Sequence, residues 1–291
     1  MIKNKNIIIT GGLGFVGSAL AMSLSKNNKV YVIDNLFTGR KKNITNKSIK
    51  LIISKSENIN RIKCLKNKHF QYFFHLGEYS RVEQSYNDIE KVIEFNTRPF
   101  YEIIKFCKKN NTKLIYSGSS TKFANYFEDN EIDISPYAWS KISNINLLKL
   151  YGKWFGIKYA VTYFYNVYGD NEISTGKYAT VIGKFLKYKK QNKILPITKP
   201  GTQRRNFTHI DDIISGLVIV AIKGDGDGYG IGSSKSYSII ELANILKMKY
   251  KMMPQKKGNR LSGKLKTKKT KELGWSCKNN LNNYLKLKSF D

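Results

Sequence analysis

The stretch Ile7-Ile8-Ile9-Thr10-Gly11-Gly12-Leu13-Gly14-Phe15-Val16-Gly17 decides the fold of this chain. Its apolar start predicts a buried strand. The glycines at 11, 14 and 17 suit a tight turn, close approach to a pyrophosphate, and helix packing on the strand. A helix is expected over 15–26, and its N-terminus offers free N–H groups to phosphates. A second strand over 29–33 leads to Asp34, whose carboxylate is placed to bind ribose hydroxyls and to favour NAD over NADP.

The rest of the chain alternates strand and helix patterns, which predicts an α/β fold with a Rossmann doubly wound parallel sheet. Ligands in such sheets bind beyond the carboxyl ends of the strands. We expect an NAD-binding domain over 1–165, to which 206–231 return, and a smaller α/β substrate-binding lobe formed by 166–205 and 232–291. Further strands are expected at 49–53, 70–76, 112–117 and 158–165, and further helices at 59–65, 89–109 and 137–155.

Composition favours a reduced, cytoplasmic enzyme. The 291 residues include no stretch long enough to cross a membrane and no signal-peptide pattern, and the three cysteines lack metal-ligand or disulfide spacing. The formal net charge is +30, but the lysines are spread along the whole chain. We therefore expect no nucleic-acid or membrane partner and no metal. A Rossmann protein that senses nucleotides or binds RNA stays open as the non-enzymatic alternative, and salt-dependent RNA binding would support it.

A second pattern carries reaction chemistry. Tyr137 and Lys141 are four residues apart and therefore share one face of a helix. A nearby ammonium and a nicotinamide cation both favour the phenolate form of a tyrosine, which is otherwise a poor base. The run Ser117-Gly118-Ser119-Ser120-Thr121 follows a predicted strand. A hydroxyl there is placed to hydrogen-bond the same substrate oxygen that Tyr137 deprotonates.

Two more motifs follow in order, Tyr165-Asn166-Val167-Tyr168-Gly169 and Arg205-Asn206-Phe207-Thr208-His209-Ile210-Asp211-Asp212. Together with the glycine turn, the serine-rich strand end and the Tyr-x-x-x-Lys pair, they resemble the extended short-chain dehydrogenase/reductases. The likeness is to the NAD-dependent nucleotide-sugar epimerase/dehydratase branch, and most of all to proteins of the UDP-glucose 4-epimerase type. It extends over almost the whole chain.

The resemblance implies a role for each matching residue. Ser119 would be the catalytic hydroxyl, Tyr137 the base and Lys141 the cofactor-binding lysine. A small side chain at Ser262 would leave room for an N-acetyl group on the sugar. The implied cofactor contacts are Gly11, Gly14, Phe15, Val16, Gly17, Asp34, Asn35, Leu76, Gly77, Asn96, Ser117 and Lys141. The implied contacts with the nucleotide sugar are Ser119, Thr121, Asn166, Arg205, Arg260 and Ser262, with the two arginines gripping the diphosphate.

The two positions after Ser119 exclude some of the reactions that the family carries out. Dehydratases of the family carry an Asp-Glu pair there, and decarboxylases carry Glu at the second position; this chain has Ser120 and Thr121. The cysteine of the GDP-fucose synthase type is also missing. The prediction is NAD-dependent 4-epimerisation of a UDP-hexose through a transient 4-keto intermediate, with UDP-Glc/Gal or UDP-GlcNAc/GalNAc as substrates. Reduction of an NDP-4-keto sugar is the alternative.

Two further expectations come from the resemblance. Family members dimerise through a four-helix bundle that includes the Tyr137 helix, and the apolar residues of 142–150 supply more than one face for such contact. Burial of those residues against the sheet alone stays open. The chain also departs from the family at Glu78, where an alanine-rich turn is usual. A carboxylate beside the nicotinamide region is expected to affect how the cofactor is held.

Overall fold

The computed structural model describes residues 1–120, 134–255 and 265–288. Three residues predicted to bind substrate, Thr121, Arg260 and Ser262, lie outside these ranges.

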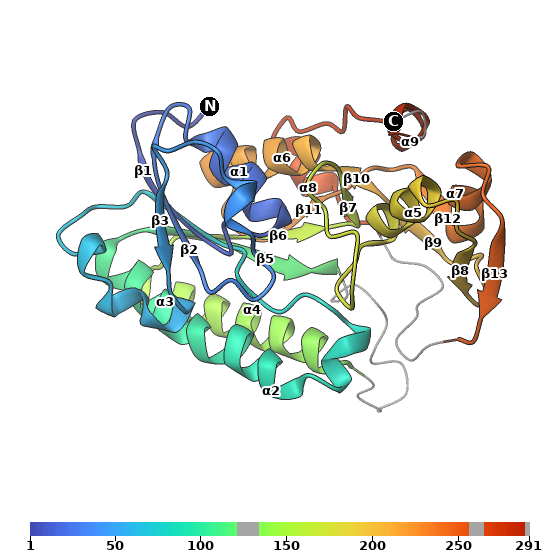
Figure 1. Cartoon of the computed structure of the whole chain (residues 1–291). Coiled ribbons are helices and arrows are strands. Elements are labelled where there is room, and N and C mark those ends of the chain that lie inside the picture. The colour runs from blue at the N-terminus through green and yellow to red at the C-terminus, as the bar shows by residue number, and fades with distance from the viewer. Residues whose placement is uncertain (121–133, 256–264, 289–291) are drawn as a thin grey trace.

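A seven-stranded sheet forms the centre of the molecule, in the order β11-β6-β5-β4-β1-β2-β3 (Figure 1). Every neighbouring pair in it is parallel, which confirms the predicted doubly wound Rossmann sheet. The strands are β1 (Asn6–Thr10), β2 (Lys29–Asp34), β3 (Lys50–Ile53), β4 (Tyr72–His75), β5 (Lys113–Ser119), β6 (Tyr159–Phe164) and β11 (Gly226–Ile231).

Helices cover both faces of this sheet (Figure 1). Helices α1 (Phe15–Leu24) and α6 (Ile210–Lys223) pack on one face, where Ile7 and Ile9 join their core. Helices α3 (Arg98–Asn110) and α4 (Pro136–Phe155) pack on the other, where Ile8 joins a second core. Because successive side chains of a strand point to opposite faces, a strand buried on both sides is apolar at every position.

Local signals set the ends of the important helices. The Ser135 side chain accepts a hydrogen bond from the Ala138 amide, and Pro136 occupies the first turn, so α4 begins just before Tyr137. Two predicted helices differ from the expectation. The segment 59–65 forms the short 3₁₀ turns Ser56–Arg61 and Lys63–Leu65, and 89–109 is divided into α2 (Ile89–Val92), a π-helical turn (Ile93–Thr97) and α3.

The smaller lobe is built from two-stranded pieces and short helices at one end of the sheet (Figure 1). Strand β7 (Val167–Tyr168) pairs with β10 (Thr208–His209), β9 (Arg204–Asn206) with β12 (Ser236–Ser238), and β8 (Leu195–Thr198) with β13 (Tyr250–Met253). Its helices are α5 (Val181–Lys190), α7 (Ile239–Ile245) and α9 (Leu281–Lys288), whereas α8 (Lys268–Glu272) packs against β11 of the central sheet. Within the described ranges, no helix has the length and apolar character needed to span a membrane.

Candidate active site

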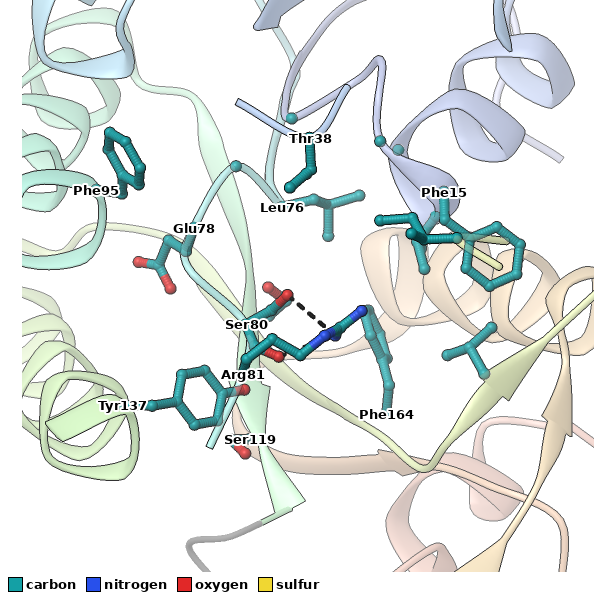
Figure 2. Close-up of a pocket in the computed structure, with 18 of the residues that line it drawn as sticks. Phe15, Thr38, Leu76, Glu78, Ser80, Arg81, Phe95, Ser119, Tyr137 and Phe164 are labelled. Atoms are coloured by element: carbon teal, nitrogen blue, oxygen red, sulfur yellow. Dashed lines mark hydrogen bonds between the residues drawn. The ribbon is translucent and has the colours of Figure 1, made fainter. Parts of the chain in front are cut away.

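A cavity of about 540 Å³ lies at the carboxyl ends of the central strands, where the fold class predicts a ligand (Figure 2). Its wall combines the glycine turn after β1, the segment after β4, the end of β5 and the start of α4. Asn166 and Arg205 of the smaller lobe close another side. The structure thus brings predicted cofactor, catalytic and substrate residues around one cavity.

The glycine turn forms a cradle that has no space for side chains. A Cβ atom at Gly17 would overlap the Gly11 carbonyl oxygen. Gly11 has a φ of +67°, and a Cβ on it would lie 2.6 Å from the Cα of Gly77. The turns after β1 and β4 therefore touch backbone to backbone, and α1 begins at Phe15, directly beyond Gly14. The free N–H groups at this helix start fit the pyrophosphate of a dinucleotide.

The other end of the cavity fits an adenosine. Asp34 ends β2 and lines the cavity beside Asn35. Its carboxylate accepts hydrogen bonds from the backbone amides of Leu13 at 2.9 Å and Leu36 at 2.8 Å. Burial raises the pKa of Asp34, although these two amide hydrogen bonds act in the opposite direction. The bonds fix the carboxylate at the position where an adenosine ribose would meet it.

The three predicted catalytic residues come from two elements that meet at the cavity. Ser119 is the last residue of β5, and Tyr137 and Lys141 occupy successive turns of α4. All three are buried and line the cavity. The Lys141 ammonium donates to the Ser117 carbonyl oxygen at 2.5 Å and lies 6.0 Å from the centre of the Tyr137 ring. This arrangement can remove a proton from a substrate hydroxyl and hold a nicotinamide ribose.

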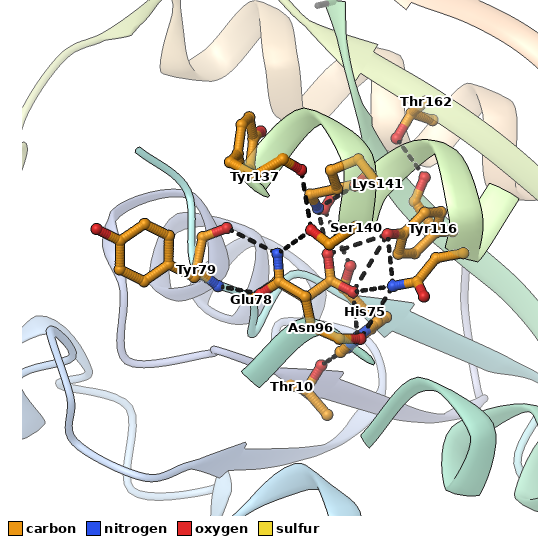
Figure 3. A network of polar contacts seen from close by, with 12 residues as sticks. Thr10, His75, Glu78, Tyr79, Asn96, Tyr116, Tyr137, Ser140, Lys141 and Thr162 are labelled. Carbon is orange, nitrogen blue, oxygen red and sulfur yellow. Dashed lines mark hydrogen bonds and ion pairs between the residues drawn. The ribbon is translucent and has the colours of Figure 1, made fainter. Parts of the chain in front are cut away.

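Behind Lys141 lies a buried polar network centred on Glu78 (Figure 3). The Glu78 carboxylate forms an ion pair with Lys141 and contacts Nε2 of His75 at 3.1 Å. It also accepts hydrogen bonds from the Tyr116 hydroxyl at 3.0 Å and the Asn144 amide at 3.1 Å. Burial by itself would raise the pKa of Glu78, but the charge of Lys141 and the contact with His75 outweigh it and hold the pKa below its usual range.

Asn96 differs from its expected place. It is fully buried and is not among the residues that line the cavity. Its side chain accepts from the Tyr79 amide at 2.6 Å and donates to the Tyr79 carbonyl oxygen and to Ser140. Asn96 therefore holds the segment after β4 against α4, and its effect on a cofactor would pass through that segment.

On the substrate side, Asn166 and Arg205 both reach the cavity. The Asn166 amide donates to the Asn206 carbonyl oxygen at 3.2 Å, which links the strand ends that carry the two residues. Arg205 donates to the Arg204 carbonyl oxygen at 2.8 Å. Successive side chains of a strand point to opposite sides. The neighbouring Arg204 therefore points away from Arg205 and forms an ion pair with Glu241 at 3.0 Å.

The sequence analysis missed several wall residues, among them Arg81. Its guanidinium donates to the carbonyl oxygens of Tyr178 at 2.5 Å and Ser80 at 3.1 Å, while its buried Nε has no partner. Burial lowers the pKa of Arg81. No spacing marks Arg81, because it lies in the loop that follows β4. The other missed residues labelled in Figure 2 are Thr38, Ser80, Phe95 and Phe164.

The described part of the chain holds no group of three or more His, Cys, Asp or Glu side chains arranged to bind a metal ion.

Comparison with known proteins agrees with this geometry. Residues 7–232 match the model of the NAD dependent epimerase/dehydratase family. The chain belongs to this family. It is an enzyme of an NAD-dependent family, and the glycine cradle, Asp34 and Lys141 are the groups that fit that cofactor.

Individual relatives show the range of reactions in the family. A putative UDP-glucose 4-epimerase of Methanocaldococcus jannaschii is 28% identical over 83% of this chain and 81% of its own length. UDP-glucuronic acid decarboxylase 3 of Arabidopsis thaliana is 27% identical over 99% and 89%. The solved UDP-glucose 4-epimerase of Thermotoga maritima, with UDP-glucose, is 27% identical and superposes with a TM-score of 0.88 over 98% and 97% of the two chains.

Proposed function

We propose that this protein interconverts the C4 epimers of a UDP-hexose through a transient 4-keto sugar. The observation that carries the proposal is the meeting of Ser119, Tyr137 and Lys141 at one cavity, in a chain with Ser120 and Thr121 where the family's dehydratases carry acids. Similarity to the epimerases of M. jannaschii and T. maritima supports it. Both UDP-Glc/Gal and UDP-GlcNAc/GalNAc are candidate pairs.

The proton is moved by residues of the chain. The phenolate of Tyr137 removes the proton of the C4 hydroxyl, and the Ser119 hydroxyl hydrogen-bonds the same oxygen. The NAD held by the glycine cradle, Asp34 and Lys141 would supply the hydride chemistry at C4, both the removal of the hydride and its return to the opposite face of the sugar. Tyr137 then returns the proton, which leaves the protein unchanged at the end of the cycle. Lys141 holds the nicotinamide ribose and stabilises the phenolate.

Inversion requires that the sugar turn while its nucleotide stays bound. Arg205 and Asn166 are placed to hold the diphosphate, and Arg260 is proposed to join them from outside the described residues. A planar guanidinium suits an anionic diphosphate because it donates two parallel hydrogen bonds. Binding energy at the nucleotide then supports chemistry at the remote sugar carbon.

We further propose that two copies of the chain associate through α3 and α4. Several large apolar side chains on this face are exposed, including Tyr101 at 47%, Trp139 at 41%, Leu150 at 42% and Trp154 at 57%. Ile145 and Leu148 of α4 instead pack against the sheet. A helix that buries one apolar face and exposes another fits a bundle with a partner copy.

Proton NMR of the purified protein tests the reaction. Without added cofactor, the protein is incubated separately with UDP-Gal and with UDP-GalNAc. Anomeric signals of the corresponding gluco sugars would establish a 4-epimerase with resident NAD. If both sugars stay unchanged after NAD is supplied, the UDP-hexose proposal is wrong. Consumption of added reduced cofactor with a 4-keto sugar would then identify a reductase.

A further inference from the structure

The proposed proton transfer assigns no role to the ion pair between Glu78 and Lys141. Both side chains are almost completely buried, with 1% of Glu78 and 5% of Lys141 exposed. The polar contacts of the Glu78 carboxylate come from three different elements: His75 on β4, Tyr116 on β5, and both Asn144 and Lys141 on α4. A carboxylate held on several sides keeps one position.

The charges of this pair cancel at the edge of the cavity. Lys141 and Glu78 both line the cavity, and the Glu78 carboxylate pairs with the Lys141 ammonium (Figure 3). A buried ammonium without a counter-ion would carry a full positive charge in a region of low dielectric. With Glu78 ionised, the pair is neutral overall, although the ammonium still faces the ligand.

Net charge matters here because the two forms of the cofactor differ by one charge at the nicotinamide ring. The oxidised ring is a cation and the reduced ring is neutral. We propose that Glu78 acts as the counter-ion of Lys141 and so sets the preference of the site for oxidised over reduced NAD. Glu78 thus acts on the cofactor through its charge, as the partner of Lys141 in the cavity wall. The inference rests on the redox role of NAD in the proposed function, but its test needs no sugar.

Other titratable groups face this pair and must be held constant. His75 contacts the Glu78 carboxylate and Tyr116 donates to it, while Tyr137 and Arg81 line the same cavity. All variants are compared at one pH, and the comparison is repeated at a second pH, so that a change in the charge of a neighbouring group would be detected.

The test is the ratio of the dissociation constants for NAD and NADH, measured by calorimetry on protein freed of nucleotide. Glu78→Gln keeps the shape of the side chain and removes its charge, so the ratio Kd(NAD)/Kd(NADH) should rise about tenfold, as expected for one charge roughly 10 Å away at intermediate dielectric. Lys141→Gln should lower the ratio by a similar factor. The double variant should return it to near the wild-type value.

The ratio Kd(NAD)/Kd(NADH) separates the effect of charge from effects that change the binding of both forms of the cofactor equally. Lys141 is also proposed to hold the ribose, and loss of that contact weakens NAD and NADH equally, so it cancels. Glu94→Gln is the matched control, because Glu94 lines the same cavity but pairs with Lys55 near the surface. It should change the ratio less than about twofold, since exposed charges are screened.

An unchanged or lower ratio for Glu78→Gln overturns the inference. If that variant fails to fold, Lys141→Gln decides, and a ratio that does not fall overturns it as well. Failure of the proposed reaction is a separate result. The binding ratio can shift as expected in a protein that epimerises neither UDP-Gal nor UDP-GalNAc.

Discussion

The Rossmann half and the smaller lobe reach the same cavity by different means. In the Rossmann half, Asp34 and Ser119 end strands of one continuous sheet, and pairing in that sheet sets their positions relative to each other. In the smaller lobe, Arg205 lies on a strand of three residues that belongs to a two-stranded piece. In the proposed reaction, the continuous sheet and α4 carry the catalytic residues, while short strands carry the residues that recognise the substrate.

The largest effect should come from the reaction chemistry on the Rossmann half. Tyr137→Phe removes the proposed base without changing the shape of the cavity, so turnover should fall about a thousandfold. NAD affinity should stay within about threefold, because no proton moves on binding. Rates are measured by NMR and affinity by calorimetry. Tyr72→Phe, on β4 away from the cavity, is the control and should keep full activity. Near-normal turnover of Tyr137→Phe would show that another group is the base.

A second substitution tests whether the glycine turn supports the fold or only the cofactor. Gly17→Ala places a Cβ against the Gly11 carbonyl oxygen, and the backbone cannot yield without moving α1. The free energy of unfolding should fall by about 3 kcal/mol, as for other overpacked sites. At Gly14, an added Cβ would lie 3.2 Å from the same oxygen.

Gly14→Ala should therefore leave the unfolding free energy within about 1 kcal/mol and lower mainly NAD affinity. Chemical denaturation without nucleotide separates the two variants. Equal stability of both would mean that the turn relaxes more easily than the backbone contacts indicate.

A substitution in the smaller lobe should change substrate binding more than it changes turnover. Arg205→Gln removes a charge-assisted contact to the diphosphate, so KM should rise roughly 10- to 100-fold while kcat changes less than about threefold. Arg204→Gln is a matched control on the same strand, since Arg204 pairs with Glu241 outside the cavity. If kcat falls as much as KM rises, Arg205 acts in the transition state, and the division between the two halves is weaker than we describe.

The smallest effect concerns the stability of the segment that leads from β7 to α5. Burial raises the pKa of Glu172 to about 7, although hydrogen bonds from Thr180 and from backbone amides lower it. One carboxylate oxygen accepts from the Thr180 hydroxyl at 2.5 Å and the other is buried without a partner. The folded protein therefore holds this proton more tightly than the unfolded chain, and stability is lost as pH rises from about 4.5 through about 7.

Glu172→Gln mimics the protonated form. It should match the wild type at pH 4 and exceed its unfolding free energy by about 2 kcal/mol at pH 8. Urea denaturation at the two pH values measures this difference. Glu90→Gln, at an exposed position of α2, should show no such pH-dependent gain. A Glu172→Gln protein that is no more stable at pH 8 than the wild type would show that water reaches this carboxylate.

Sequence patterns predicted most of the Rossmann half because its signals are local. The glycine turn, Asp34 and the Tyr137–Lys141 spacing depend on one strand or one helix, and each lies where the pattern indicates. For Asn96 the sequence did not show that its side chain bonds to Tyr79 and Ser140 and is not among the residues that line the cavity, so its predicted contact with the cofactor stays a prediction. Arg81 was missed because it reaches the cavity from a loop without periodicity.

The sequence by itself determined the parallel Rossmann sheet, the dinucleotide cradle and the family, because glycines, alternating elements and i, i+4 pairs act over short distances along the chain. Only the tertiary structure decided that Glu78 neutralises Lys141 and that Arg205, and not Arg204, faces the cavity. Glu78 and Lys141 are far apart in the chain, and they meet only after β4, β5 and α4 pack together. Burial then strengthens the interaction between their charges, whereas solvent screens the charges of the exposed lysines of this chain.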